Sequence, residues 1–473
     1  MARATLDYLS DAERAFVHEQ TVRVLEEVGV AYNTPLLTPL LLGAGADVDA
    51  EHLTARLPWD LVERCLQTVP SEVLLAGRDP AFDCRLDDDG ILYSSDGNAT
   101  HMLDDATGTR RLGVRRDLAR MMRLFDALPE IDYALATIIP SDIETEAAAL
   151  ETVLLGFENS RKHLQDAART PEEVPALIEL LEAIAGAPLS QRPIYSVYNC
   201  TVAPLQHDRA TTEAHILLAR AGVPVFVFPM PQMGTTAPKS VLGTSIVNLA
   251  ELLSAVVLFQ LAAPGCAIVS TVGGAATEMR SGAYLAGAPE DCLINVVCIE
   301  MSHFYGLRAQ GSAVTCDAHG CDMQAGAEGA LTGMACALAG AEAILAFGLV
   351  DSAQTASLAK TVLDADTVGA IQRFSREDPV NQATALVDDI IEAGIGGQFL
   401  TRKSSRRGGG AGDLWLPRSW SRSPIEQHAG SDLVRGAAAR AEDLISASDV
   451  PPLPDEVRRL AESLIRGRLA SVA

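Results

Sequence analysis

Short apolar runs alternate with longer amphipathic segments through the middle of the chain, from about residue 90 to about residue 375. β-Branched and aromatic residues in the runs favour strands, and the segments between them have helical periodicity. The predicted strands cover residues 91–94, 131–138, 163–166, 194–200, 223–228, 266–272, 307–312 and 343–347. Helices are expected near residues 116–126, 145–159, 172–186, 209–221, 240–263, 289–304, 322–339 and 359–373.

Eight strand–helix units in series predict a parallel sheet with right-handed crossovers, and therefore an α/β protein. Their span of roughly 280 residues matches the size of a (β/α)8 TIM barrel. An open, doubly wound sheet is the alternative, because the runs at 163–166 and 307–312 have weak patterns. The absence of a G-x-G-x-x-G motif after an early strand weakens that alternative.

The pattern changes at both ends of the barrel region. Residues 1–88 are expected to form a helical extension, in which Ser10 and Glu13 have the spacing of a capping box. Residues 89–375 are assigned to the barrel. Residues 376–473 are expected to form a C-terminal loop and helices that pack on it.

The C-terminal part contains three helical patterns and one irregular stretch. The helices are expected near residues 380–394, 432–447 and 454–470. Residues 401–422 form a basic, glycine-rich stretch with two tryptophans, which predicts an excursion across the surface. This stretch is either a solvated loop or a mobile element that orders over a ligand or a partner.

Charge and apolar content narrow the classes of partner. The 473-residue chain has a formal net charge of −25, which argues against nucleic acid and against anionic membranes. The most apolar segment, 240–263, contains Asn248, Glu251 and Gln260, so it is expected to be a buried helix. Nine scattered cysteines indicate a reducing compartment, and the N-terminus lacks the apolar stretch of a signal peptide. A cytoplasmic protein is therefore expected.

Polar and aromatic residues gather where the predicted strands end. In a (β/α)8 barrel, the loops after the strands carry the functional groups. The residues at these positions are Asp96, Asn98, His101, Asn199, Thr201, Phe228, Gln232, Thr277, Glu278, Arg280, Gln310, Phe347 and Asp351.

A polar loop follows the seventh predicted strand. Cys316, His319 and Cys321 offer soft metal ligands, and Asp317 and Asp322 offer hard ones. The C-x2-H-x-C spacing matches no standard zinc motif. Three interpretations stay open and are not mutually exclusive: a metal site, a loop in which Asp322 caps the next helix, and a contact with a ligand.

The helix after this loop is rich in alanine and glycine. Gly326, Gly329, Gly333 and Gly340 remove side-chain bulk from it. Gly329 and Gly333 have the spacing of a membrane dimer motif, but Glu328 and the short apolar length favour close packing in a folded core.

Three familiar chemistries find little support in the sequence. Gly273-Gly274 is not followed by the Lys and Ser/Thr of a phosphate-binding loop, and no G-x-S-x-G motif is present. Glu278 and Asp351 could form the carboxylate pair of a glycoside hydrolase, but the aromatic content of 5% is low for a sugar-binding cleft.

Several motifs, taken in order, resemble the trimethylamine methyltransferase family. They are DGNATHMLDDATGTRRLGVRRDLARMMRLFDALPEIDY from Asp96, VGGAATEMRSGAYLAGAPE from Val272, DAHGCDMQAGAEGALTGMACALAGAEAI from Asp317 and LDADTV from Leu363. FLTRK and a later W-x-P, at Trp415 and Pro417, fit the C-terminal region of the family. The resemblance covers about residues 10–447.

The resemblance implies a (β/α)8 barrel that transfers a methyl group from a methylated amine to the Co(I) corrinoid of a separate small protein. The chain would then have no tightly bound cofactor of its own. The founding branch of the family uses pyrrolysine, whereas this sequence contains only standard residues. It therefore resembles the non-pyrrolysine branch, which acts on quaternary amines such as glycine betaine, and trimethylamine itself becomes doubtful as the substrate.

A quaternary amine substrate defines roles for the residues at the strand ends. Aromatic faces should surround the cation, and the aromatic candidates are Tyr93, Tyr195, Phe228 and Phe347. The carboxylate of a betaine would bind donors, for which the candidates are Asn199, Gln232, Arg280 and Gln310. The expected substrate-binding set is Asn98, Tyr195, Asn199, Phe228, Gln232, Arg280, Gln310, His319 and Phe347. No proton-transferring residue and no metal ligand is expected, because a quaternary amine leaves without protonation.

A corrinoid protein is expected to dock over the C-terminal face of the barrel, near the loop after the fifth strand and residues 401–422. One alternative is a zinc-dependent barrel methyltransferase with a thiol acceptor, supported only by Cys316 and Cys321. A second alternative is a barrel that binds a betaine without catalysis. The apolar helices are also compatible with a homo-oligomer.

Overall fold

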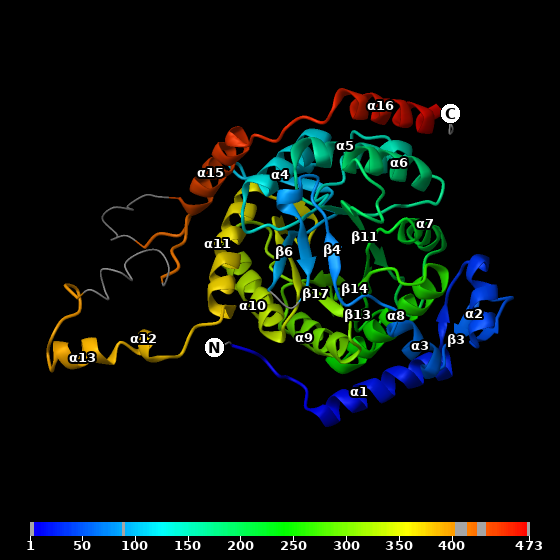
Figure 1. Cartoon of the computed structure of the whole chain (residues 1–473), viewed down its shortest axis with the longest axis horizontal. Helices are drawn as coiled ribbons and strands as arrows, with labels where there is room; N and C mark the ends of the chain where they lie inside the picture. Colours follow the sequence, from blue (N-terminus) through cyan, green and yellow to red (C-terminus); the bar gives the residue numbers. More distant parts are fainter. Residues whose placement is uncertain (1–3, 88–89, 403–413, 423–431, 471–473) are drawn as a thin grey trace.

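The core of the molecule is a closed barrel of eight parallel strands (Figure 1). The computed structural model describes residues 4–87, 90–402, 414–422 and 432–470. The barrel strands are β6 (Leu92–Ser95), β9 (Ala134–Leu135), β10 (Leu164–Asp166), β11 (Tyr195–Cys200), β12 (Val225–Phe228), β14 (Ile268–Thr271), β17 (Arg308–Ser312) and β18 (Ala343–Phe347). β18 pairs with β6, and a parallel bridge between Ser94 and Tyr133 closes the ring beside β9. The predicted (β/α)8 barrel is confirmed, including both weakly patterned strands.

Eight helices surround the barrel, as Figure 1 shows. They are α4 (Arg115–Ala127), α5 (Ala148–Asn159), α6 (Val174–Ala185), α7 (Arg209–Arg220), α8 (Val241–Ala262), α9 (Pro289–Phe304), α10 (Met323–Ala339) and α11 (Leu358–Ser375). A 3-10 turn, Thr145–Ala147, leads into α5. Side chains of the N-cap residues Asp208, Ser240, Asp322 and Ser357 accept backbone N–H groups at the starts of four helices. These caps fix where the chain turns from a strand-end loop into a helix.

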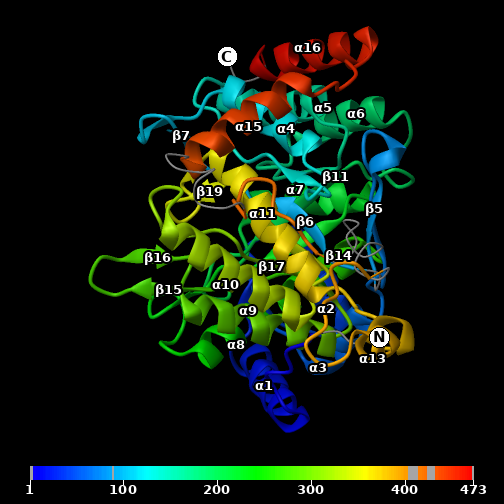
Figure 2. The same ribbon diagram turned by 90° about the vertical axis from the view of Figure 1, so that its left-hand side faces the viewer.

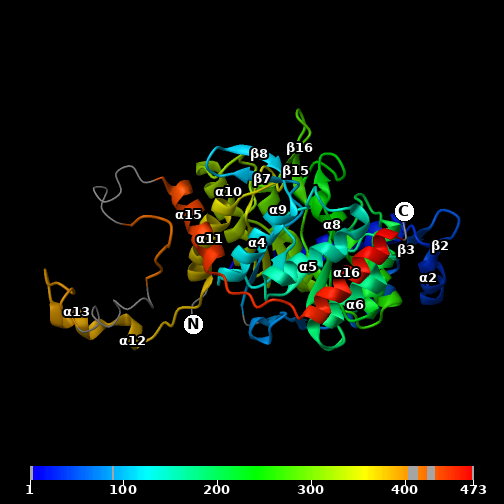
Figure 3. The same cartoon turned by 90° about the horizontal axis from the view of Figure 1, so that it is seen from above.

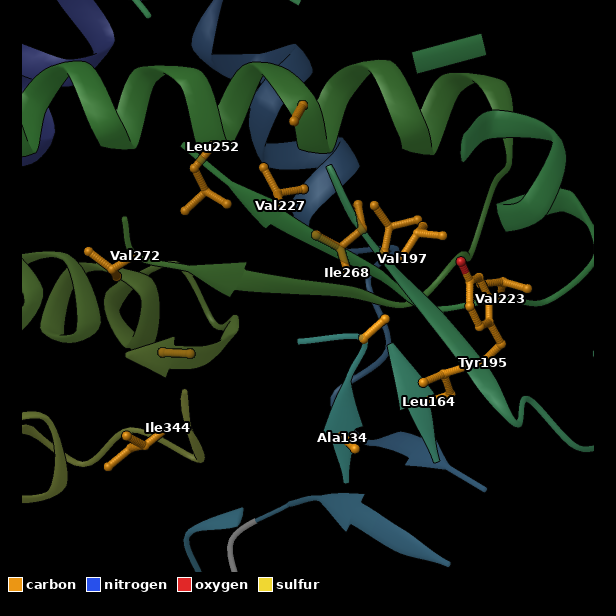
Figure 4. Close-up of a cluster of buried hydrophobic side chains, with 14 of the residues drawn as sticks. Ala134, Leu164, Tyr195, Val197, Val223, Val227, Leu252, Ile268, Val272 and Ile344 are labelled. Carbon is orange, nitrogen blue, oxygen red and sulfur yellow. The ribbon is translucent and has the colours of Figure 1, made fainter. Parts of the chain in front are cut away.

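Side chains of the strands alternate between two apolar layers. Tyr133, Tyr198 and Phe226 belong to a cluster inside the barrel. Tyr195 and Val197, on the other face of β11, pack between the strands and the helices (Figure 4). Because neighbouring residues of a strand point to opposite faces, a shift of one position decides whether a side chain enters the barrel.

The N-terminal extension is mixed and not purely helical. It contains α1 (Asp11–Arg23), a π-helical turn (Val24–Val28), α2 (Thr38–Ala44), α3 (Trp59–Leu66), and 3-10 turns at Pro35–Leu37 and Pro80–Phe82. Its strands are β1 (Val30–Ala31), β2 (Asp47–Asp49), β3 (Thr54–Arg56), β4 (Val73–Leu75) and β5 (Cys84–Leu86). The capping box of Ser10 and Glu13 is present. The strands were not predicted, because segments of two or three residues are too short to show alternation.

The hairpin of β4 and β5 covers the N-terminal end of the barrel. Val73, Leu75 and Leu86 are fully or almost fully buried and join the interior cluster. The Ala76 N–H donates to the Pro193 carbonyl just before β11. This end of the barrel is therefore closed by the hairpin, with His163 and Ser196 buried beneath it and hydrogen-bonded to each other, and the open cavity lies at the opposite, C-terminal face.

Extra strands extend from the C-terminal face. β7 (His101–Asp104) and β8 (Thr109–Leu112) form a sheet with β19 (Leu349–Val350) and β20 (Thr355–Ala356). β13 (Gln232–Met233), β15 (Ala275–Glu278) and β16 (Ala283–Leu285) form a second small sheet. Figures 2 and 3 show the β15–β16 hairpin projecting beyond the barrel. These elements form a raised rim around the mouth of the barrel.

Helix α8 is the one helix in the described ranges that is long and apolar enough to cross a membrane. Asn248 and Glu251 are nevertheless buried inside the molecule, where Asn248 donates to the Pro229 carbonyl and Glu251 accepts from the Leu205 N–H. α8 also packs against α1, α3 and α9. The helix is part of the folded core, as its polar residues predicted.

The C-terminal part begins with an extended arm. α12 (Gln382–Ala385) and α13 (Val387–Ala393) stand away from the barrel in Figures 1 and 3. α15 (Leu433–Ala447) packs against α4 and α11, and α16 (Asp455–Ala470) packs against α5 and α6. The three predicted helical regions are present. Residues 403–413, which hold most of the predicted basic stretch, lie outside the described residues.

Candidate active site

A cavity of about 550 Å³ opens at the C-terminal face of the barrel. Its floor consists of inward-facing residues of β11, β12, β17 and β18. Its walls come from the loop after β6, the turn after β19, and the β15–β16 hairpin. The described lining contains aromatic, amide and carboxyl side chains, and none of its residues is Lys, Arg or His. Each of the three groups of side chains has defined partners.

Three aromatic rings line the cavity: Tyr198, Phe228 and Tyr284. The Tyr198 hydroxyl donates to the Asn98 side-chain oxygen at 2.8 Å, and the Tyr284 hydroxyl donates to the Gly273 carbonyl at 3.3 Å. Gly273 makes room for Phe228, because a Cβ built there would lie 2.4 Å from Phe228 Cε2. The phenol protons are held in place and the rings are fixed, so they offer aromatic faces and no acid–base chemistry.

Amide side chains supply hydrogen-bonding groups around these rings. Gln310 is almost fully buried; its oxygen accepts from the Thr271 hydroxyl at 3.0 Å and its nitrogen donates to the Tyr133 hydroxyl. Asn98 has a left-handed backbone (φ 71°), which places its side chain beside Tyr198. Gln232 accepts a long, 3.4 Å hydrogen bond from the Thr277 hydroxyl. Each of these amides retains N–H groups for a ligand.

Two buried carboxyl groups face the same space. Asp96 accepts from the Gly97 N–H at 2.7 Å and the Thr315 hydroxyl at 2.6 Å. Asp291, in the first turn of α9, accepts from the Asn295 amide at 3.2 Å. Burial raises the pKa of both carboxyls, and at Asp291 the neighbouring Asp317 carboxylate raises the pKa further. A cation in the cavity would relieve this penalty on the ionised form.

The turn after β19 is strained at the cavity mouth. Asp351, Ser352 and Ala353 line the cavity and have φ values of 58°, 49° and 66°. Three consecutive non-glycine residues in the left-handed region cost on the order of 1–2 kcal/mol each, and such strain concentrates at functional sites. The Asp351 carboxylate is held by an ion pair with Arg110 at 2.7 Å and by a 2.8 Å hydrogen bond with His319 Nδ1.

Four residues of the predicted substrate-binding set meet in the cavity: Asn98, Phe228, Gln232 and Gln310. Three others do not. Tyr195 and Phe347 are fully buried in the layer between strands and helices, and Asn199 donates to His215 of α7 at 3.0 Å. These three do not line the cavity: Tyr195 and Asn199 occupy outward positions of β11, and the register shift between Leu345 and Phe347 moves Phe347 off the inward face of β18. Tyr93, on the outward face of β6, is likewise buried in that layer.

The two charged candidates lie outside the cavity. Arg280 is on the β15–β16 hairpin, where its side chain is 95% exposed and contacts Glu278 at 3.4 Å. His319 has an 89% exposed side chain and reaches the cavity only through its hydrogen-bond partner Asp351. Neither side chain lines the cavity, so the predicted pairing of Arg280 with a substrate carboxylate lacks the necessary geometry.

The Cys/His loop is not assembled as a metal site. Cys316 Sγ contacts the Leu349 carbonyl, Cys321 Sγ contacts the Ser357 hydroxyl, and His319 turns outward to Asp351. No group of three or more His, Cys, Asp or Glu side chains suited to a metal occurs among the described residues. Asp322 caps α10, as one of the three interpretations predicted.

Sequence reasoning missed several lining residues. Tyr198 and Gln165 lie on strands but were not recognised as inward-facing, and Tyr284 and Asp291 belong to segments beyond the strand ends. The alternation along β11 carried a signal for Tyr198, because Tyr195 and Tyr198 are three positions apart and must point to opposite faces. Asp96 was seen at a strand end but was not placed in the site.

Comparisons with known proteins match this architecture. A model of the family described as trimethylamine methyltransferase (MTTB) matches residues 2–473. A trimethylamine methyltransferase from Desulfitobacterium hafniense (strain DSM 10664 / DCB-2) is 29% identical over 394 residues, covering 83% of this chain and 79% of that protein. A glycine betaine methyltransferase from D. hafniense (strain Y51) is 26% identical and covers 93% of this chain and 92% of its own.

Solved structures agree with the fold. The monomethylamine methyltransferase (MtmB) of Methanosarcina barkeri has a TM-score of 0.55 at 10% identity, and covers 98% of this chain and 88% of its own. A hydroxylamine complex of MtmB has the same TM-score at 12% identity, with coverage of 93% and 90%. The likeness at this identity concerns the fold alone. The family match over nearly the whole sequence shows that this chain belongs to the trimethylamine methyltransferase (MTTB) family.

Proposed function

We propose that this protein transfers a methyl group from a small quaternary amine, betaine-type donors included, to the Co(I) corrinoid of a partner protein. The main support is the composition of the cavity, which three aromatic rings and three carboxyl groups line. None of the described lining residues is Lys, Arg or His. Aromatic faces and carboxylates both attract a methylated ammonium group. The glycine betaine methyltransferase relative supports a quaternary donor.

The residues of the cavity would act by binding and orientation. Tyr198, Phe228 and Tyr284 surround the ammonium group, and the carboxylates of Asp96 and Asp291 balance its charge. Gln310, fixed by Thr271 and Tyr133, holds the other end of the donor. Positioning of this kind can supply about 7–11 kcal/mol toward a bimolecular reaction. No side chain has to move a proton, because a quaternary nitrogen leaves as a neutral amine.

The acceptor would approach from the C-terminal face. Co(I) supplies the electron pair that forms the new bond to carbon, while the electron pair of the broken C–N bond stays on nitrogen. The cavity suits this approach because its mouth lies between the turn after β19 and the β15–β16 hairpin. The corrinoid belongs to the partner protein, so this chain is expected to hold no cofactor of its own.

An anaerobic assay tests the proposal. The purified chain, its matched corrinoid protein and free cob(I)alamin are each combined with tetramethylammonium, choline, glycine betaine and trimethylamine. Loss of the Co(I) absorbance and release of the demethylated amine are measured together. At least one quaternary amine is expected to react. No reaction with any quaternary donor, with a competent corrinoid protein present, contradicts the proposed function.

A variant connects the activity to the cavity. Phe228→Ala removes one aromatic face, and since such a contact is worth about 0.5–2 kcal/mol, catalytic efficiency should fall roughly 2- to 30-fold. Phe16→Ala is the matched control, because Phe16 is 50% exposed on α1 and far from the cavity in the chain. An equal loss in both variants would show that the effect is not specific to the site.

A further inference from the structure

The described lining of the cavity contains acidic side chains and no basic ones. This charge affects which chemical group the donor can carry beyond its ammonium group. Asp96, Asp291 and Asp351 all line it, and they come from three separate segments of the chain. No Lys, Arg or His belongs to the described lining. The charged side chains of the described lining are therefore all acidic, and its other polar groups are amides and hydroxyls.

The nearest guanidinium groups are engaged elsewhere. Arg110 contacts Asp351 at 2.7 Å, so the two charges offset each other at the rim, and the acidic character of the cavity rests on Asp96 and Asp291. Arg280 points into solvent from the hairpin, beside Glu278. Arg169 lines a neighbouring small cavity that shares Asn98, and Asp166 lines the same space. A carboxylate entering the main cavity would therefore meet like charges before it met a free basic group.

The amides can satisfy a neutral polar group. Gln310 is fixed at both ends of its amide and retains one N–H, and Asn98 has its oxygen occupied by Tyr198. The side-chain oxygen of Gln232 accepts only long, 3.4 Å hydrogen bonds from the Thr235 and Thr277 hydroxyls, so its amide is open to a ligand. One or two amide donors suffice for a hydroxyl or a carbonyl oxygen, whereas a desolvated carboxylate needs charged or several donors.

We propose that the donor is a net cation, a methylated ammonium with a neutral hydroxyl or carbonyl tail, and that zwitterionic betaines are discriminated against. This inference rests on the proposed function and narrows its substrate class. The basis is the meeting of Asp96 and Asp291 with amide side chains in one cavity. A betaine carboxylate would face repulsion, and the described lining residues offer it no basic partner.

Choline and glycine betaine form a matched pair of probes, because they differ in a hydroxymethyl against a carboxylate group. Calorimetric titration of the full chain should give at least about tenfold tighter binding for choline, which corresponds to about 1.4 kcal/mol. Methyl transfer to cob(I)alamin should show the same order in kcat/KM. Equal or tighter binding of glycine betaine overturns the inference, as does failure of both choline and tetramethylammonium to bind.

Two variants test the cause of the preference. Gln232→Arg places a guanidinium in the lining, and should reduce the choline to betaine affinity ratio at least about tenfold. Asp291→Asn removes one carboxylate, which weakens the attraction for the ammonium group of both ligands but also relieves the repulsion of the betaine carboxylate, and so should reduce the same ratio. Asp60→Asn, an exposed carboxylate on α3, is the control and should leave the ratio unchanged. An unchanged ratio in correctly folded Gln232→Arg, judged by its circular dichroism spectrum, contradicts the charge argument.

The two proposals fail in different ways. Binding of choline over glycine betaine without methyl transfer from any donor would support the charge preference and contradict the methyltransferase activity. Methyl transfer from glycine betaine with a kcat/KM equal to or above that of choline would support the activity and overturn the preference. The binding measurement needs neither corrinoid nor partner protein, so its result is independent of the acceptor.

Discussion

Two carboxyl groups, those of Asp96 and Asp291, make ligand binding depend on pH. Burial raises the pKa of both, so they keep their protons to higher pH than exposed aspartates. A bound cation favours the ionised form and lowers these pKa values again. Affinity for choline is therefore expected to rise with pH until both groups are ionised, and binding below that point should release protons.

Calorimetry checks this expectation. Titrations with choline at a series of pH values, each in two buffers of different ionisation enthalpy, give the affinity and the number of protons released. The Asp291→Asn variant should release fewer protons than the wild-type chain at the same pH. An affinity that stays constant from about pH 5 to about pH 9 would show that neither carboxyl responds to the ligand.

The same carboxyls affect folding stability with a definite sign. Because the pKa of each is raised in the folded state, their stabilising contribution is complete below the unfolded pKa and is lost as the pH rises through the folded pKa. A bound cation restores part of that loss. The choline-induced rise in melting temperature is thus expected to be larger at neutral pH than at acidic pH.

Single residues mark how far the sequence predicted the site. Asn98, Phe228, Gln232 and Gln310 line the cavity, because strand ends of a barrel converge at one face, and their role in substrate binding stays a prediction. Tyr195 does not line it, since it points to the face of β11 opposite to Tyr198. Arg280 was chosen for its charge, yet the hairpin that carries it points into solvent.

The close packing of helix α10 depends on glycines, which have no side chain. A Cβ at Gly333 would lie 2.7 Å from Ile371 Cδ1 and 2.9 Å from Val314 Cγ2, and one at Gly329 would lie 3.0 Å from the Val314 carbonyl oxygen. A Cβ at Gly326 would have no atom within 4 Å. The close packing predicted from the Ala/Gly pattern is confirmed, and it joins α10 to α11 and the end of β17.

Gly326 and Gly333 provide a matched pair of variants on this helix. Gly326→Ala should raise the free energy of unfolding by up to about 1 kcal/mol, because alanine is the better helix former. Gly333→Ala gains the same propensity but overpacks the interface, and should be about 1–3 kcal/mol less stable than Gly326→Ala. Urea unfolding measures both variants. Equal stabilities would mean that the interface adjusts without cost.

Elements were predicted where they belong to a repeated pattern. All eight barrel strands and their helices were recognised, because an alternation repeated eight times is a strong pattern. The strands of the N-terminal extension and the rim, which are two to four residues long, were not predicted, since they stand outside that repeat. The Tyr284-bearing hairpin is one of these, which explains why part of the cavity wall was missed.

At the scale of the molecule, the arm formed by residues 376–402 is the part least covered by the rest of the chain. None of its residues is buried, and Val380, Ile391 and Leu400 are 79%, 72% and 81% exposed. Figures 2 and 3 place α13 toward the end of the barrel opposite the β15–β16 hairpin. A partner docked at the cavity mouth would therefore leave the arm exposed.

We expect a second copy of this chain to contact the arm. A groove of about 650 Å³ beside the base of the arm is lined by Phe374, Trp415 and Trp420, by Arg373, Arg376 and Arg422, and by Asp378, which pairs with Arg373 and Arg376. The arm itself carries apolar residues and the acidic residues Asp388, Asp389 and Glu392. An isologous dimer in which each arm enters the other groove would pair these surfaces.

Light scattering during size-exclusion chromatography tests this prediction. The wild-type chain is expected to be a dimer or a higher oligomer at micromolar concentration. Ile391→Glu should dissociate it, because it places a charge in the apolar contact. Gln382→Glu adds the same charge to an exposed polar position of the arm and should leave the oligomer intact. A monomeric wild-type chain would contradict the prediction.

The separation between barrel strands and rim has a consequence for how such a protein can evolve. In the proposed function, side chains of the strands, such as Gln165, Tyr198 and Gln310, would hold the donor, whereas an acceptor would pass the hairpins built on the loops. Changes in the hairpins away from Tyr284 could then select a different partner protein while the donor pocket stays intact. Equally, one or two substitutions of inward-facing residues could change which donor is preferred while the docking surface stays the same. Related proteins could then keep an existing partner protein and use a new donor.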